Sequence, residues 1–258
     1  MQERERLLHQ GQYALECGDF GGAATLLEQA LAVTPADNDV RLMLAEALAE
    51  DGRLPQALKV LEAQQGDLED PERLLALGDL YFEQGRESQA ETVYRKVLAL
   101  EPESADALVS LGLVLRHRDH LVEAVATFER ALASEPESVF ALNALGEARL
   151  AQGDAAAALE VFEQALSLDP EDAQIHLSIA DLHYDAGALE AAESACNKAL
   201  ALDASLAQAY LILGNLYLDQ DLTEDARDAF EKFLQREQSP ASKELREDVK
   251  ALLDGLDD

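Results

Sequence analysis

Residues 74–102 read LLALGDLYFEQGRESQAETVYRKVLALEP, and the pattern in this stretch decides the fold. Apolar residues recur every three or four positions up to Tyr81, Gly85 follows, and a second series of the same spacing starts at Ala90. That spacing is typical of one helix face, and glycine is common just past a helix end. The stretch therefore predicts a helix, a tight turn and a second helix that ends before Pro102.

The same unit recurs along nearly the whole chain of 258 residues. The alanine at position 20 of the unit returns at steps of 34, 33, 34, 34, 34 and 34 residues: Ala23, Ala57, Ala90, Ala124, Ala158, Ala192 and Ala226. The copies are residues 4–37, 38–70, 71–104, 105–138, 139–172, 173–206 and 207–240. A fixed period between 20 and 50 residues indicates stacked supersecondary units instead of one globular core.

Glycine recurs at two positions of the unit, and the first of them lies inside a predicted helix. These position-8 glycines are Gly11, Gly78, Gly112, Gly146 and Gly214. A glycine in a helix interior costs about 1 kcal/mol relative to alanine. Its repeated use predicts a packing reason, which close approach of the neighbouring helix supplies.

The recurring residues of the quoted stretch resemble the signature of the tetratricopeptide repeat: Leu77, Gly78, Tyr81, Gly85, Ala90, Tyr94 and Pro102. The resemblance covers residues 4–240 and recurs seven times. It implies an all-α fold, a right-handed superhelical α-solenoid of seven helix-turn-helix repeats. We expect one solenoid domain over residues 4–240.

The second repeat departs from this pattern. It is one residue short, has Gln64 at position 27, where alanine is usual, and continues into a polar stretch up to Asp67. We expect a local irregularity there.

Residues 239–256 predict a final amphipathic helix. Ser239 can cap it, and Pro240 suits its first turn. Its apolar stripe is Leu245, Val249, Leu252, Leu253 and Leu256. Terminal repeats need their apolar face covered. We therefore expect residues 241–258 to form a capping helix and an acidic tail; a docking helix for another protein is the alternative.

The charge balance excludes one class of partner. The chain has 52 acidic and 20 basic side chains, a formal net charge of −32. Such a chain repels phosphate backbones, so we expect no nucleic-acid binding. The acidity fits either a field that steers partners or an adaptation to high salt. The chain also lacks an apolar run of about 18 residues, so we expect no membrane insertion and a cytoplasmic location.

In the tetratricopeptide repeat family, the first helices line a concave face, and positions 2, 5, 9, 12 and 13 point into it. Position 5 is mostly apolar and forms a predicted floor: Leu42, Leu75, Val109, Asn143, Leu177 and Leu211. Positions 9, 12 and 13 add mostly acidic or polar candidates: Glu46, Asp79, Glu83, Glu147, Asp181, Tyr184, Asp185, Asn215 and Asp219. This groove predicts a basic or amphipathic protein or peptide as partner. The alternative is that solvent-facing positions of a very acidic protein are simply acidic.

Arg116 and His117 interrupt the acidic groove in the fourth repeat. They form a cationic spot that either anchors a carboxylate or phosphate of the partner or complements the negative end of its own helix. We expect no metal site, because nothing near His117 supplies a full ligand set.

The sequence contains no Ser-His-Asp arrangement, glycine-rich phosphate loop or zinc-binding motif. We therefore expect neither an enzyme nor a cofactor, but a scaffold that holds a partner during assembly of a larger complex. Two alternatives are a chaperone for a basic secreted client and a regulatory or specificity subunit of an enzyme encoded elsewhere. The oligomeric state stays open.

Overall fold

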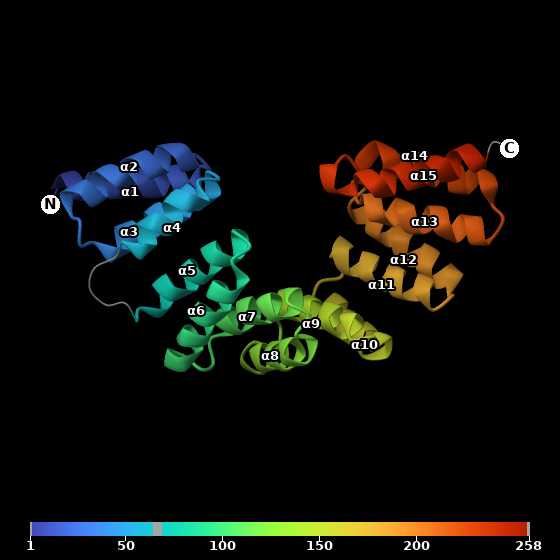
Figure 1. Ribbon diagram of the computed structural model, residues 1–258, viewed down its shortest axis with the longest axis horizontal. Coiled ribbons are helices and arrows are strands. Elements are labelled where there is room, and N and C mark those ends of the chain that lie inside the picture. Colours follow the sequence, from blue (N-terminus) through green and yellow to red (C-terminus); the bar gives the residue numbers. More distant parts are fainter. Residues whose placement is uncertain (1, 64–68, 257–258) are drawn as a thin grey trace. The chain divides into compact units, whose positions relative to one another are not determined.

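The computed structural model describes residues 2–63 and 69–256, and all regular structure in these residues is helical (Figure 1). The all-α repeat architecture expected from the sequence is confirmed. The chain divides into two compact units, Met1–Pro136 and Glu137–Asp258, which are described here one at a time. The predicted single right-handed solenoid through all seven repeats stays a prediction.

The described residues of the N-terminal unit form four helix pairs. Its first helices are α1 Gln2–Glu16, α3 Asn38–Glu50, α5 Pro71–Glu83 and α7 Ala105–His117. Its second helices are α2 Phe20–Val33, α4 Leu54–Glu62, α6 Glu87–Leu100 and α8 Leu121–Ser134. Each helix packs against the next along the chain from α1 to α8, and α3 also contacts α5. Since α5 also contacts α7, the first helices of the second, third and fourth repeats are neighbours in chain order.

In the C-terminal unit, the part that the structure describes forms three helix pairs and a final helix. The pairs are α9 Val139–Ala151 with α10 Ala155–Leu168, α11 Ala173–Asp185 with α12 Leu189–Leu202, and α13 Ala207–Asp219 with α14 Thr223–Arg236. A short 3₁₀ turn, Pro240–Ser242, leads into α15, Lys243–Gly255. No helix in the described residues of either unit is long and apolar enough to cross a membrane.

The turn inside each repeat has one residue with a positive φ. In five repeats this residue is glycine, with φ between 69° and 82°: Gly18, Gly52, Gly85, Gly153 and Gly187. The fourth and seventh repeats have Asp119 and Asp221 there, with φ of 62° and 59°. Aspartate tolerates the left-handed region better than most side chains. The turn geometry is therefore kept where the glycine is missing.

Four of the five position-8 glycines face an aromatic ring on the second helix of the same repeat, and Gly11 faces Leu27. A Cβ built on Gly78 would lie 2.4 Å from the Tyr94 ring, and one on Gly112 would lie 2.5 Å from the Phe128 ring. Both rings are almost fully buried. A side chain opposite one of these rings would push the two helices apart; the second and sixth repeats, which have Ala45 and Ala180 at position 8, carry no aromatic ring at position 24. This confirms the packing reason expected for these glycines.

The second repeat has the shortest of the second helices, because α4 ends at Glu62 after 9 residues, whereas α6 has 14. The expected irregularity at Gln64–Asp67 lies outside the described residues. The end of α4 is held by Arg73 from the next repeat, whose Nε and Nη2 donate to the Leu61 carbonyl at 3.2 and 3.0 Å. This arginine is 6% exposed.

The C-terminal helix α15 packs on α14 (Figure 1). Val249 is 1% exposed and forms a core cluster with Phe230 and Phe233. The α-helix begins later than the sequence indicates, at Lys243, because Pro240–Ser242 form a 3₁₀ turn. Such turns are common at helix N-termini. Ser239 still caps this segment by accepting a hydrogen bond from the Ala241 amide at 3.2 Å.

Candidate partner-binding site

The N-terminal unit has a cavity of about 220 Å³ between α3 and α5. Four of the predicted partner-binding residues line it: Leu42 and Glu46 on α3, and Asp79 and Glu83 on α5. The other lining residues are apolar: Ala45, Ala49, Leu61, Ala76 and Leu80. We call this space the α3–α5 cavity. It combines apolar walls with carboxylates from both helices.

Small side chains open the α3–α5 cavity. Ala49 occupies position 12, which is filled by larger side chains in the other six repeats: Leu15, Phe82, Arg116, Leu150, Tyr184 and Leu218. Leu61 occupies position 24, where Tyr94 lies in the next repeat. The second repeat therefore puts less side-chain volume at this place than its neighbour does.

Asp79 is the most enclosed carboxylate of the cavity. The Tyr94 hydroxyl donates to its Oδ1 at 2.6 Å, and the Ser110 hydroxyl lies 3.5 Å from the same oxygen. Burial raises the pKa of Asp79 above its ordinary value, although these hydrogen bonds act in the opposite direction. Both hydrogen bonds, which come from described residues, end on Oδ1 of Asp79, and neither ends on Oδ2. One oxygen of a partly desolvated carboxylate thus remains open to a donor.

The carboxylates around the cavity have no cationic partner among the described residues. Burial, and then the charges of Asp79 and Glu50, raise the pKa of Glu83. No lysine, arginine or histidine in the described part of the chain forms an ion pair with Glu46, Glu50, Asp79 or Glu83. Like charges therefore gather here without neutralisation, which favours binding of a cation.

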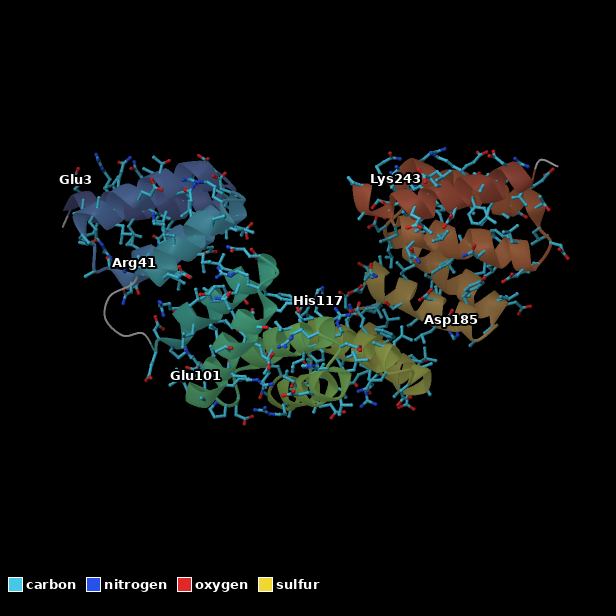
Figure 2. All side chains as sticks on the ribbon, viewed as in Figure 1. Glu3, Arg41, Glu101, His117, Asp185 and Lys243 are labelled. Atoms are coloured by element: carbon cyan, nitrogen blue, oxygen red, sulfur yellow. The ribbon has the colours of Figure 1, made fainter. Side chains whose placement is uncertain are left out.

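A second group of carboxylates in the same unit is paired. The Nδ1 of His117, labelled in Figure 2, lies 2.6 Å from Glu87 Oε1, and Arg118 forms an ion pair with Glu91. Of the two side chains in the predicted cationic spot, Arg116 and His117, the histidine therefore already contacts a carboxylate of α6. Arg116 itself is half-buried on α7.

Arg95 extends this pairing to α8. Its guanidinium lies 3.0 Å from Glu91 and 2.6 Å from Glu123. Hydrogen bonding to Glu123 raises the pKa of Arg95 further. We call the set formed by Glu87, Glu91, Glu123, Arg95, His117 and Arg118 the ion-paired edge.

The C-terminal unit has its own acidic positions on neighbouring first helices. Tyr184 on α11 donates to Asp219 on α13 at 2.9 Å, and burial raises the pKa of Tyr184 to about 12. Burial, followed by the charge of Asp185, raises the pKa of Asp181. Four of the predicted residues thus interact within α11 and α13: Tyr184 with Asp219 through a hydrogen bond, and Asp181 with Asp185 through like charge.

The predicted apolar floor has little exposed surface outside the second and third repeats. Val109, Leu177 and Leu211 are 9%, 5% and 9% exposed, because position 5 packs into the core there. Leu42 and Leu75 are half-buried and keep more accessible area. The part of the floor that a partner can reach therefore lies mainly on α3 and α5.

The remaining predicted residues lie on α9 and α13. Asn143, Glu147 and Asn215 are all half-buried. The sequence interpretation omitted Phe140, at position 2 of α9, which is 62% exposed. An aromatic residue at a position that the family directs to the groove was the available signal. It also omitted Ala49, because one small residue at this position forms no recognisable sequence motif.

The described residues, 2–63 and 69–256, contain no group of three or more His, Cys, Asp or Glu side chains that could hold a metal ion. The candidate site is therefore described by its cavity, its carboxylates and its apolar walls.

Family models described as tetratricopeptide repeat match residues 14–78, 75–139, 143–207 and 207–240. The matches cover most of the chain. It belongs to the tetratricopeptide repeat family, whose members are generally non-catalytic modules that bind proteins or peptides. A comparison with curated protein sequences gives no match.

Solved structures agree with this assignment at the level of the fold. A tetratricopeptide repeat protein from Parabacteroides merdae ATCC 43184 is 23% identical with a TM-score of 0.77, and the match covers 100% of both chains. PilW, a type IV pilus biogenesis factor, is 21% identical with a TM-score of 0.72, over 78% of this chain and 94% of PilW. The APC/C hetero-tetramer Cut9-Hcn1 contains a chain that is 21% identical with a TM-score of 0.70, over 81% of this chain and 42% of that one. These identities show the fold alone.

Proposed function

We propose that the chain is a non-catalytic scaffold that binds a basic or amphipathic segment of a partner protein at the α3–α5 cavity, in the assembly of a larger complex. Membership of the tetratricopeptide repeat family supports a protein or peptide as the ligand. The observation that carries the proposal is the set of four carboxylates, Glu46, Glu50, Asp79 and Glu83, that lack a cationic partner among the described residues beside an apolar-walled cavity.

The basic half and the apolar half of an amphipathic segment each gain from contact with this site. A cation that enters removes the repulsion among the carboxylates, and complementary charge also speeds association. Apolar side chains gain about 25 cal/mol for each Å² removed from water. A segment with basic and apolar residues satisfies both surfaces, whereas an acidic segment meets like charge.

The test uses a fluorescein-labelled amphipathic peptide of about four helical turns, with lysines on one face and leucines on the other. We expect binding by fluorescence anisotropy at low salt, and none by the same peptide with glutamates in place of the lysines. The variant E46Q/E50Q/D79N/E83Q is expected to weaken binding about tenfold or more, equivalent to about 1.4 kcal/mol.

The matched control is E101Q/E103Q/E135Q/E137Q, which removes the same number of charges from exposed linkers between repeats. We expect it to weaken binding only about twofold, since distant exposed charges are screened. Equal losses in the two variants would mean that net charge alone attracts the peptide. Absence of lysine-peptide binding to the wild-type chain would overturn the proposed function.

A further inference from the structure

We propose that the α3–α5 cavity accepts one long aliphatic cationic side chain, lysine or arginine, from the partner segment, with its stem between α3 and α5 and its charged end at Asp79 and Glu83. The inference rests on the proposed function and names the residue that anchors the partner.

The first argument is shape. The lining residues run from Leu42 to Ala49 on α3 and from Ala76 to Glu83 on α5, so each wall is about two helical turns, or ~10 Å, long. A lysine side chain beyond its Cβ has a few methylenes and an ammonium. At roughly one water's ~30 Å³ share each, these four groups need on the order of 120 Å³. The 220 Å³ cavity is large enough for this side chain or for arginine.

The second argument is the chemistry of the walls. Ala45, Ala49 and Ala76 offer only methyl groups, which suit the methylenes of an extended stem. Carboxylates stand on both walls, with Glu46 on α3 and Glu83 on α5. Long cationic side chains commonly bury their stem along apolar surface while their head meets a polar group. The cavity provides both kinds of surface.

The third argument excludes other occupants. A leucine or phenylalanine would fill the cavity but would bury Asp79 further without neutralising it, which is unfavourable. An acidic side chain would add to the like charges of Glu46 and Glu83. A short cation would reach the carboxylates but leave the alanine walls in contact with water. Only a long cationic side chain satisfies the walls and the carboxylates together.

The fourth argument is the orientation of Asp79. Tyr94, which is 1% exposed, donates to Oδ1 at 2.6 Å and fixes the carboxylate to the core. The hydrogen bonds from the described residues leave Oδ2 for an incoming ammonium or guanidinium. Charge-assisted hydrogen bonds of this kind are roughly twice as strong as neutral ones. The acceptor is thus held in place before the ligand arrives.

The first test replaces each lysine of the amphipathic peptide in turn, on the wild-type chain. Norleucine keeps the stem and removes the charge, and diaminopropionate keeps the charge and removes most of the stem. At one position we expect both replacements to weaken binding about tenfold or more, and at the other positions about twofold. Small, uniform losses along the whole peptide would overturn the anchor.

The second test fills the cavity. We expect A49L to reduce the affinity for the lysine peptide about tenfold and to remove the difference between lysine and norleucine at the anchor position. The control is A151L, the same substitution at an exposed position near the end of α9. Helical content measured by circular dichroism should be unchanged in both variants, since leucine is a good helix former.

The outcomes separate the anchor from the proposed function. If the lysine peptide binds and E46Q/E50Q/D79N/E83Q weakens it, but A49L and the norleucine scan change nothing, the anchor is wrong and the proposed function stands. If the lysine peptide does not bind to the wild-type chain, both are wrong.

Discussion

The α3–α5 cavity and the ion-paired edge lie in the same unit and differ in what surrounds their carboxylates. At the edge, Glu91 has two arginine partners, Arg95 and Arg118. At the cavity, burial and like charge raise the pKa values of Asp79 and Glu83, and the described residues supply no cation. With 20 basic side chains for 52 acidic ones, the chain can neutralise only some of its carboxylates. The comparison teaches that the placement of its few cations distinguishes the ion-paired edge from the proposed binding surface.

The largest expected effect on this comparison concerns Arg73, which contacts the cavity-lining residue Leu61. Arg73 lies on α5, the same helix as Asp79, but its guanidinium donates to the Leu61 carbonyl at the end of α4. We expect R73L to cost about 1–3 kcal/mol, because it leaves a buried carbonyl without these donors. Since Leu61 lines the cavity, the binding surface should loosen as well.

The measurement for R73L is hydrogen exchange resolved by segment. Amides of α4 should exchange faster, while amides of α8 should keep their protection. The matched control is R41L, which removes an arginine that is 7% exposed and donates to the Pro35 carbonyl before α3. Faster exchange in α4 in both variants alike would show general destabilisation and contradict the local role of Arg73.

The second expected effect is on the pH dependence of peptide binding. The raised pKa values of Asp79 and Glu83 mean that these carboxyls take up protons at a higher pH than ordinary carboxyls, which titrate near 4. A protonated carboxyl no longer attracts a cation. Affinity for the lysine peptide should therefore fall about tenfold between pH 7 and about 4.5, beginning above the ordinary range.

Isothermal titration at several pH values measures this effect. The variant D79N/E83Q provides the control, because it lacks both titrating groups and should show a much flatter profile. An equally steep decline in the variant would assign the pH dependence to other carboxyls, and the cavity would lose its special role.

The sequence predicts the repeats well because their determinants are local. Gly85 is required by a positive φ in the turn, and Gly78 by the Tyr94 ring in the same repeat. The positive φ recurs in the turn of every repeat and the glycine–ring contact in four of the seven repeats, so the spacing reveals both. The sequence also places Asp79 and Glu83 on one face of α5, which helical periodicity is sufficient to show.

The cavity and the ion pairs could not be predicted in the same way. The cavity depends on Ala49 being small next to a neighbouring helix, which is a property of packing between repeats. The pairing of Arg118 with Glu91 joins residues 27 apart, and the sequence gives no rule for which acid an arginine reaches. Two groups of acidic residues that look alike in the sequence therefore have different electrostatic environments in the structure.

The third prediction tests the ion-paired edge. We expect E91Q to lower the stability by about 0.5–1 kcal/mol at low salt, the upper range for partly exposed pairs, because Glu91 serves two arginines. Thermal unfolding measures the change. In about 1 M salt the difference from the wild type should shrink, since screening weakens the pairs. A loss that is independent of salt would indicate packing instead of charge.

The smallest expected effect has the opposite sign and concerns Asp79. Because burial raises its pKa in the folded chain, the folded state binds more protons than the unfolded state between the ordinary and the raised value. The free energy of unfolding therefore falls as the pH rises through that window, and the charged form remains unfavourable at neutral pH.

D79N removes the charge and keeps an oxygen that can accept a hydrogen bond from Tyr94. At pH 7 we expect its melting temperature to rise by roughly 1–2 °C, the shift that a fraction of a kcal/mol produces in a chain of this size. The gain should disappear as the pH falls below the window, where the wild-type carboxyl is also neutral.

The control is E101Q, at an exposed linker position, which should show no such gain in melting temperature at either pH. If D79N instead lowers the stability at neutral pH, as we expect for E91Q, the charge of Asp79 is already compensated by its surroundings within the fold. The contrast between the cavity and the edge would then fail.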